Sequence, residues 1–353
     1  MNLQRAASAA FLTLTLTACT APPAPPAPAP SPGEPSLSLY FAPEVGVDTA
    51  GVRLIPITTP KGTFKVWTKR FGRNPRIKLL LLHGGPGATH EYFEALERGL
   101  GAEGIEFIYY DQLGSAWSEQ PKDASLWTIE RFVDEVEQVR GALGLTKSDF
   151  YLLGHSWGGV LAIEYALAHP QQLKGLVISN MMTSIPDYNS YANEVLAKGM
   201  DPAVVKEIRE LEKAGQYESP RYMELLLPNF YAKHICRLEP WPDAVNRAFA
   251  KLNKDIYVPM QGPSEFSVSG LLEKWDRKVD LGRLEMPTLV IGAAHDTMDP
   301  EHMRWVSTQV KRGSFLLCPN GSHLAMWDDQ RIYVGGLARF LKEVDAGKTS
   351  VAF

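Results

Sequence analysis

The chain has 353 residues, of which 45% are hydrophobic and 22% charged, with a formal net charge of −4 at pH 7. This length and apolar content allow a large buried core, so a wholly disordered chain is excluded. Nucleic-acid binding needs a basic face for the phosphates, and the slightly acidic balance argues against that partner. No cluster of cysteine and histidine has the spacing of a metal site, so we expect neither a metal nor another cofactor.

The first residues predict an exported protein. Residues 1–18 carry one positive charge, at Arg5, and then an apolar stretch too short to span a bilayer. Leu16-Thr17-Ala18-Cys19 resembles the bacterial lipobox, which implies removal of residues 1–18, acylation of Cys19 and a lipid-anchored protein of the cell envelope. An ordinary secretory signal with an incidental cysteine is the alternative. Residues 19–35 are almost wholly Ala, Pro and Ser, which predicts an extended tether.

From residue 36 to about residue 180, apolar runs alternate with helical patterns, as is typical of a parallel sheet with helices on both faces. Two alternating segments, Val52–Thr59 and Thr63–Arg70, flank Pro60-Lys61-Gly62 and predict a leading hairpin. Apolar runs predict further strands at Ile77–Leu82, Ile105–Tyr110, Phe150–Leu153 and Leu173–Ser179. Helical spacing predicts helices at Ile129–Leu143 and Trp157–His169.

The pattern changes between residues 181 and 280. Helical spacing dominates there, at Val195–Glu212, Pro220–Ile235 and Pro242–Asn253, among many aromatic residues and prolines. Strands resume at Pro287–Gly292 and Gly313–Leu317, and a helix around Arg331–Val344 closes the chain. The sequence therefore predicts a helical cap, residues 181–280, inserted into an α/β core formed by residues 36–180 and 281–353.

One serine lies at a tight turn between a predicted strand and a predicted helix. Gly154-His155-Ser156-Trp157-Gly158 has glycines two residues before and two residues after Ser156, which leaves room for a strained turn that exposes the hydroxyl. A chance G-x-S-x-G match in a glycine-rich loop is the alternative. The strand before, the helix after and a third glycine at Gly159 favour a nucleophile.

A tetrahedral intermediate at Ser156 needs hydrogen-bond donors for its oxyanion. The loop His83-Gly84-Gly85-Pro86-Gly87 follows a predicted strand, and its glycines let backbone N–H groups approach a substrate closely. We expect the N–H groups of Gly85 and Trp157 to form the oxyanion hole. A plain turn after the strand is the alternative for the loop.

A serine nucleophile also needs an imidazole and a carboxylate that orients it. In α/β folds of this type the order along the chain is serine, acid, histidine, each after a strand. Asp296 and His323 occupy those places, with Asp299 as the competing acid. His155 adjoins the nucleophile, but we expect it to point elsewhere.

These motifs together resemble the proline iminopeptidase family, close to the tricorn-interacting aminopeptidase type. The matching residues are His83–Gly87, Asp111-Gln112 with Gly114 and Ser118, Gly154–Gly159, Asp296 four residues before Pro300, and Gly321–Trp327. The resemblance covers residues 36–353 and implies an α/β-hydrolase fold with an inserted helical cap.

The resemblance implies a serine aminopeptidase that acts on short peptides with a free N-terminus. Ser156 would be the nucleophile, His323 the general base, Asp296 the orienting acid, and Glu265 the cap glutamate that binds the substrate amine, with Glu239 as a second candidate. Leu113, Ser115 and Ala116 depart from the usual family pattern, so we expect small or apolar N-terminal residues to be accepted beside proline.

Two other functions remain open on the sequence. An esterase or amidase for small acyl compounds would use the same serine, and an envelope binding protein would keep the fold without catalysis. Cys236 and Cys318 lie far apart in sequence, and we expect them to be buried free thiols.

Overall fold

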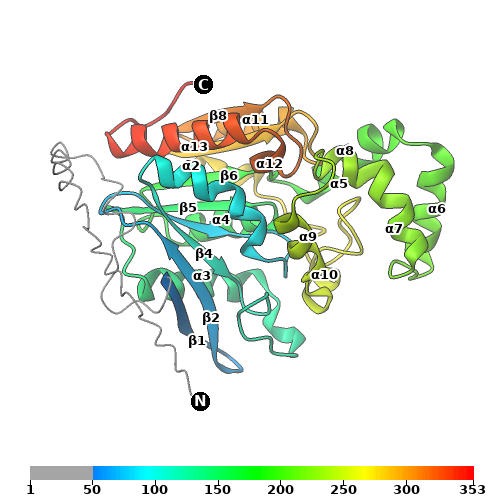
Figure 1. Ribbon diagram of the computed structural model, residues 1–353, viewed down its shortest axis with the longest axis horizontal. Coiled ribbons are helices and arrows are strands. Elements are labelled where there is room, and N and C mark those ends of the chain that lie inside the picture. Colours follow the sequence, from blue (N-terminus) through cyan, green and yellow to red (C-terminus); the bar gives the residue numbers. More distant parts are fainter. Residues whose placement is uncertain (1–50) are drawn as a thin grey trace, which may run out of the picture. The chain divides into compact units, whose positions relative to one another are not determined.

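The computed structural model describes residues 51–353 of the chain (Figure 1). The predicted signal at residues 1–18, the tether at residues 19–35 and the lipidation site Cys19 lie outside the described residues. None of the helices between residues 51 and 353 is both long and apolar enough to cross a bilayer.

An eight-stranded sheet forms the centre of the core, in the order β1-β2-β4-β3-β5-β6-β7-β8. The first two strands form the predicted hairpin and pair antiparallel, and β2 also runs antiparallel to β4. All the remaining pairs are parallel. The strands are β1 (Val52–Thr59), β2 (Gly62–Phe71), β3 (Lys78–Leu82), β4 (Glu106–Asp111), β5 (Phe150–His155), β6 (Gly175–Ser179), β7 (Thr288–Ala293) and β8 (Gly313–Cys318). The predicted fold class, an α/β-hydrolase fold with a mostly parallel sheet, is confirmed.

Helices cover both faces of the sheet because both faces are apolar. On β5, Tyr151 and Leu153 belong to one buried cluster, whereas Phe150 and Leu152 belong to the other. Alternate residues of a strand point to opposite faces, so a continuous apolar run requires cover on both sides. The helices of the core are η2 (His90–Leu96), α2 (Glu97–Ala102), η3 (Ala124–Leu126), α3 (Ile129–Ala142), α4 (Trp157–Ala168), α11 (Pro300–Gln309), α12 (Ala325–Asp328) and α13 (Gln330–Asp345).

Between β6 and β7 the chain is helical and contains no strand within residues 181–280. Helices α6 and α7 extend away from the sheet (Figure 1). The elements between β6 and β7 are α5 (Ile185–Tyr191), η4 (Ala192–Leu196), η5 (Ala197–Gly199), α6 (Pro202–Lys213), α7 (Pro220–Leu226), η6 (Leu227–Tyr231), α8 (Ala232–His234), α9 (Asp243–Ala250), α10 (Lys254–Met260) and η7 (Lys278–Arg283), which crosses the predicted boundary at residue 280; we refer to this insertion as the cap.

The cap helices are shorter than their spacing predicts, and local chemistry explains the breaks. The helix predicted at Val195–Glu212 is interrupted because Asp201 caps a new helix by accepting the Ala203 N–H at 2.8 Å, with Pro202 in its first turn. The segment predicted at Pro220–Ile235 contains Pro228, which lacks an N–H, and it continues as a π-helix, η6.

Candidate active site

Ser156 lies in the strained turn that its flanking glycines predict. Its backbone has φ 56° and ψ −129°, a conformation that residues with a side chain rarely adopt. Its N–H donates to the Ser179 carbonyl at 3.1 Å, which ties the turn to the end of β6. A Cβ on Gly158 would lie 2.1 Å from the Leu82 carbonyl oxygen, so only glycine allows α4 to start this close to β3. The turn therefore holds the hydroxyl at the carboxyl end of the sheet.

His323 and Asp296 come from separate loops and meet beside this turn. Asp296 Oδ1 lies 2.8 Å from His323 Nδ1, and both side chains are buried. Because a carboxylate only accepts, Nδ1 carries a proton and Nε2 is the nitrogen left to act as a base. Asp299, the rival acid, instead caps α11 by accepting the Glu301 N–H at 2.9 Å.

The hydroxyl of Ser156 forms no hydrogen bond with His323 in the described part of the chain. Both residues nevertheless line the same cavity. Hydrogen bonds between a nucleophile and its base are often long in ligand-free enzymes and shorten when substrate binds. The turn and the imidazole thus border one cavity, and the Asp296 carboxylate is bonded to the imidazole.

The Asp296 carboxylate has further donors that sequence reasoning missed. Asn180 Nδ2 donates to Asp296 Oδ2 at 2.7 Å, and the Met298 N–H donates to Oδ1 at 3.2 Å. Asn180 directly follows β6, and functional residues of α/β proteins often lie at the carboxyl ends of parallel strands. This position was the signal in the sequence that could have marked Asn180 as a site residue. These bonds fix the orientation of the carboxylate and, through it, of the imidazole.

The electrostatics favour a basic imidazole. Burial alone would lower the pKa of His323, but the neighbouring Asp296 carboxylate and then Glu265 outweigh it, and the pKa lies above its ordinary value. An imidazole with a raised pKa accepts the proton of a serine hydroxyl more readily, provided that the pH keeps it neutral beforehand.

The two N–H groups expected at the oxyanion hole are free to donate. Neither the Gly85 N–H nor the Trp157 N–H has a hydrogen-bond acceptor among residues 51–353. Gly85 has φ +108°, which places it in a conformation that favours glycine. Trp157 is the first residue of α4, where backbone N–H groups have no partner within the helix.

A hydrogen-bond bridge links the loop that carries Gly85 to the residue after the nucleophile. The Trp157 indole N–H donates to Gln112 Oε1 at 2.9 Å, and Gln112 Nε2 donates to the His83 carbonyl at 2.9 Å. The His83 ring completes the bridge: its Nδ1 faces the Gly84 carbonyl at 2.9 Å, and its Nε2 accepts the Gln112 N–H at 3.1 Å. Burial lowers the pKa of His83 to about 4, which keeps this ring neutral at pH 7.

A second chain of hydrogen bonds joins the same loop to the catalytic histidine. The Gly84 N–H donates to the Tyr92 hydroxyl at 2.6 Å, and this hydroxyl lies 3.1 Å from His155 Nδ1. His155 Nε2 lies 2.8 Å from the His323 carbonyl. A carbonyl only accepts, so Nε2 carries the proton of the neutral His155 ring and Nδ1 accepts from Tyr92. Burial, the largest cause, keeps the pKa of His155 well below its ordinary value and that of Tyr92 well above it, so every donor in this chain keeps its proton.

The loop that carries His323 is also fixed to the cap. The His323 N–H donates to the His234 carbonyl at 2.9 Å, and the Leu324 N–H donates to the Ile235 carbonyl at 2.8 Å. Asp328 accepts the N–H of Ser322 at 2.9 Å and the N–H of Arg237 at 3.1 Å. The cap therefore shares backbone hydrogen bonds with the catalytic loop.

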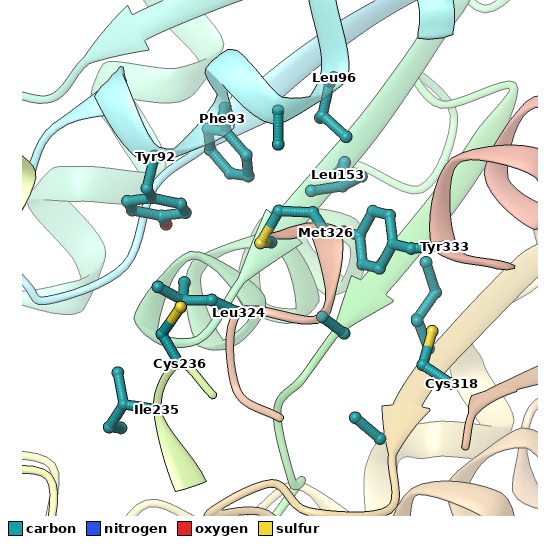
Figure 2. Close-up of a cluster of buried hydrophobic side chains, with 14 of the residues drawn as sticks. Tyr92, Phe93, Leu96, Leu153, Ile235, Cys236, Cys318, Leu324, Met326 and Tyr333 are labelled. Atoms are coloured by element: carbon teal, nitrogen blue, oxygen red, sulfur yellow. The ribbon is translucent and has the colours of Figure 1, made fainter. Parts of the chain in front are cut away.

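Apolar packing also joins the loop that carries His323 to the cap (Figure 2). The stick view shows Leu324 and Met326, which follow His323, in one cluster with Tyr92 and with Ile235 of the cap. Cys236 and Cys318 belong to this cluster as free, buried thiols, as the sequence analysis expected. Burial raises the pKa of Cys236 to about 11, so its thiol stays protonated.

A cavity of about 280 Å³ opens above Ser156 and His323, between the core and the cap. Its walls include six aromatic side chains: Tyr92, Tyr217, Tyr222, Tyr231, Phe249 and Tyr257. Glu265 also lines it and accepts the Tyr257 hydroxyl at 2.6 Å. Burial raises the pKa of the Glu265 carboxyl above its ordinary value. A carboxylate in such surroundings is suited to a cationic partner.

Glu239 does not reach this cavity, and we correct the expectation that it does. Its side chain is exposed and is not among the residues that line the space above Ser156. The segment turns back on itself because the Trp241 indole donates to the Cys236 carbonyl at 2.9 Å. A partly buried acid that was not predicted, Glu212, contacts one wall of the cavity: it accepts the hydroxyl of Tyr222, and burial raises the pKa of the Glu212 carboxyl.

The described residues contain no group of three or more histidine, cysteine, aspartate or glutamate side chains placed to hold a metal ion.

Comparison with known proteins places the chain in a family. A family model described as the alpha/beta hydrolase fold matches residues 78–330. The chain is 60% identical over 297 residues to a proline iminopeptidase of Flavobacterium johnsoniae, covering 84% of this chain and 100% of the relative. It is 58% identical over 294 residues to a proline iminopeptidase of Elizabethkingia meningoseptica, covering 83% of this chain and 98% of the relative.

A solved structure agrees with these relatives. The crystal structure of the proline iminopeptidase of Mycobacterium smegmatis matches with a TM-score of 0.73 at 29% sequence identity, covering 84% of this chain and 99% of the other. The chain belongs to the proline iminopeptidase family of the α/β-hydrolase fold.

Proposed function

We propose that this protein is a serine aminopeptidase that releases N-terminal proline from short peptides. The relatives at 58% and 60% identity are proline iminopeptidases, and the chain spans nearly their whole length. The observation that carries the proposal is Glu265, a carboxylate that lines the same cavity as Ser156 and His323. The free ammonium of a peptide substrate is a cationic partner for this carboxylate.

The reaction proceeds through an acyl-enzyme. His323 Nε2 takes the proton of Ser156, whose Oγ attacks the carbonyl carbon of the N-terminal residue. The N–H groups of Gly85 and Trp157 stabilise the oxyanion. His323 then protonates the leaving amine, so that the peptide departs and the residue remains esterified to Ser156. Water activated by His323 hydrolyses that ester.

The substrate amine determines where cleavage occurs. The substrate ammonium binds the Glu265 carboxylate, and this contact holds the first carbonyl group of the peptide at Ser156. The enzyme therefore releases one residue per catalytic cycle. A second, much smaller hollow of about 10 Å³ also touches Ser156 and Glu265, and its walls include Val160 and Met298. The mostly apolar walls beside Ser156 suit proline and other small or apolar residues at the N-terminus.

Three substrates separate this proposal from an esterase or amidase. Proline p-nitroanilide should be cleaved efficiently, whereas its N-acetylated form should lose at least about a hundredfold in kcat/KM because it cannot pair with Glu265. A small p-nitrophenyl ester without an amine serves as the third substrate. Equal cleavage of the free and the blocked anilide would favour the esterase or amidase. If a fluorophosphonate probe fails to label Ser156 in folded protein, the non-catalytic binding protein is favoured.

We also propose that the protein is anchored to a bacterial membrane through Cys19 and acts in the cell envelope. The support is the sequence Leu16-Thr17-Ala18-Cys19 with the apolar stretch before it and the Pro/Ala-rich residues after it. The mature protein should carry acyl chains at Cys19 by mass spectrometry and sediment with membranes. A Cys19→Ser variant should lose both properties, and a soluble, unacylated wild-type protein would refute the anchor.

A further inference from the structure

The charged groups of the main cavity differ in depth. Glu265 lies at its inner end, beside the buried His323, whereas Lys254 and Glu218 lie where it meets solvent, with side chains 61% and 66% exposed. Among the described residues that line this cavity, Lys254 is the only lysine or arginine. A short peptide has an ammonium at one end and a carboxylate at the other. The cavity presents the complementary charges in the same order, from the inside outward.

The backbone of this lysine is fixed relative to the catalytic loops. Asn253, the preceding residue, donates its N–H to the Gly87 carbonyl at 2.9 Å and its side-chain amide to the Gly114 carbonyl at 2.7 Å. Gly87 belongs to the loop that carries Gly85. The backbone of Lys254 is thus held at a set distance from the oxyanion hole, and its side chain is exposed.

Helix stability does not explain a lysine at this position. Lys254 is the first residue of α10, where the helix dipole disfavours a positive charge. Its partner within the described residues is Glu218, at 3.2 Å. An ion pair this exposed contributes little to stability, so a competing carboxylate can readily displace Glu218.

We propose that Lys254 binds the free C-terminal carboxylate of a short peptide whose N-terminal ammonium binds Glu265. Glu218 occupies the lysine in the free enzyme and is displaced when the peptide enters. This inference rests on the proposed aminopeptidase function and narrows its substrates to peptides of a few residues with an unblocked C-terminus. Because an extended chain spans at most about 3.6 Å per residue, one peptide length should match the span between the two charges best.

The test uses prolyl peptides of two, three and four residues, with alanine after the proline, each as the free acid and as the C-terminal amide. Released proline is measured to give kcat and KM. For the best length, the wild-type enzyme should show a KM about five- to tenfold lower for the acid than for the amide. This preference should shrink as ionic strength rises, because salt screens an exposed charge pair.

Substitutions at the cavity mouth identify the source of the preference. Lys254→Met should raise the KM of the acid to that of the amide and leave the amide unchanged. Glu218→Gln should lower the KM of the acid by about twofold or more, since it removes the competing carboxylate. Lys206→Met is the matched control, because Lys206 forms an exposed pair with Glu210 on α6, at 3.8 Å, away from the cavity. It should retain the acid preference in full.

The outcomes separate this inference from the function on which it rests. If the wild-type enzyme cleaves acids and amides equally at every length, or if Lys254→Met keeps the preference, Lys254 does not bind the carboxylate, and the aminopeptidase function stands. If no proline is released from any peptide, acid or amide, the aminopeptidase function itself is wrong.

Discussion

The hydrogen-bond chain from Gly84 through Tyr92 and His155 to the His323 carbonyl makes a sharp prediction. Tyr92→Phe removes one hydroxyl that both accepts from Gly84 and donates to His155. The aromatic ring, which lines the cavity and belongs to the core cluster, is retained. The substitution therefore probes the hydroxyl with little change in packing.

The structure sets the size of the expected effect. Two buried polar groups, the Gly84 N–H and His155 Nδ1, lose their partner, and each costs about 1–3 kcal/mol when it is left unsatisfied. The free energy of unfolding should therefore fall by about 2–6 kcal/mol, and local relaxation around the two groups makes the loss smaller. Gly84 adjoins the oxyanion donor Gly85, and small displacements of a catalytic group can cost about a hundredfold. We expect kcat to fall by about ten- to a hundredfold, with KM changed by less than about threefold.

Steady-state kinetics on proline p-nitroanilide and urea denaturation measure the two effects. Tyr151→Phe is the control, because Tyr151 is also buried on β5 and donates its hydroxyl to the Leu341 carbonyl, at 3.3 Å, away from the cavity. It should lose stability and retain kcat. If Tyr92→Phe remains folded and keeps kcat within about twofold of wild type, the chain does not position the oxyanion loop, and this reasoning is refuted.

Three further substitutions test other parts of the site. Glu265→Gln should lower kcat/KM for prolyl substrates by about 10- to 100-fold and leave kcat/KM for an ester without an amine nearly unchanged. It should also move the acidic limb of the pH profile to lower pH, because Glu265 helps to raise the pKa of His323. An unshifted limb would contradict that coupling. Asp328→Asn turns an acceptor of the Ser322 and Arg237 N–H groups into a partial donor, so it should lower kcat by about tenfold while the acyl-enzyme stays detectable by mass spectrometry. An unchanged kcat would show that these contacts of Asp328 are not needed to position the His323 loop. The pKa of His83 is about 4 in the folded protein, below the usual 6.5. The free energy of unfolding therefore includes the full contribution of the neutral ring above about pH 6.5. This contribution, about 3 kcal/mol in total, is lost as the pH falls toward 4. Urea denaturation of wild type and of His83→Asn between pH 7.5 and 4.5 should show a shallower pH dependence in the variant, and equal slopes would refute it.

The sequence predicted those parts of the structure that depend on local chemistry and chain order. A continuous apolar run specifies a strand covered on both faces, so β3 to β8 were placed within a few residues. The glycines around Ser156 specify a strained turn, which the structure shows. The order of serine, acid and histidine selected Asp296 over Asp299, and only Asp296 contacts His323.

The remaining parts depend on contacts between segments far apart in sequence. The sequence around Tyr92 does not reveal its contact with His155, and the place of Asn180 after β6 does not identify Asp296 as its partner, because both contacts form only in the tertiary fold. Glu239 was selected from its neighbours in sequence, but the turn closed by Trp241 leaves it in solvent. The role inferred for Lys254 likewise depends on its depth in the cavity, which spacing along the chain does not reveal.

The nucleophile provides the most direct test of the account. Turnover of proline p-nitroanilide by Ser156→Ala, measured on protein with wild-type folding by circular dichroism, should fall by about four to six orders of magnitude, because the hydroxyl that forms the acyl-enzyme is gone. A folded Ser156→Ala protein that still releases p-nitroaniline at a rate near that of the wild type would contradict the mechanism.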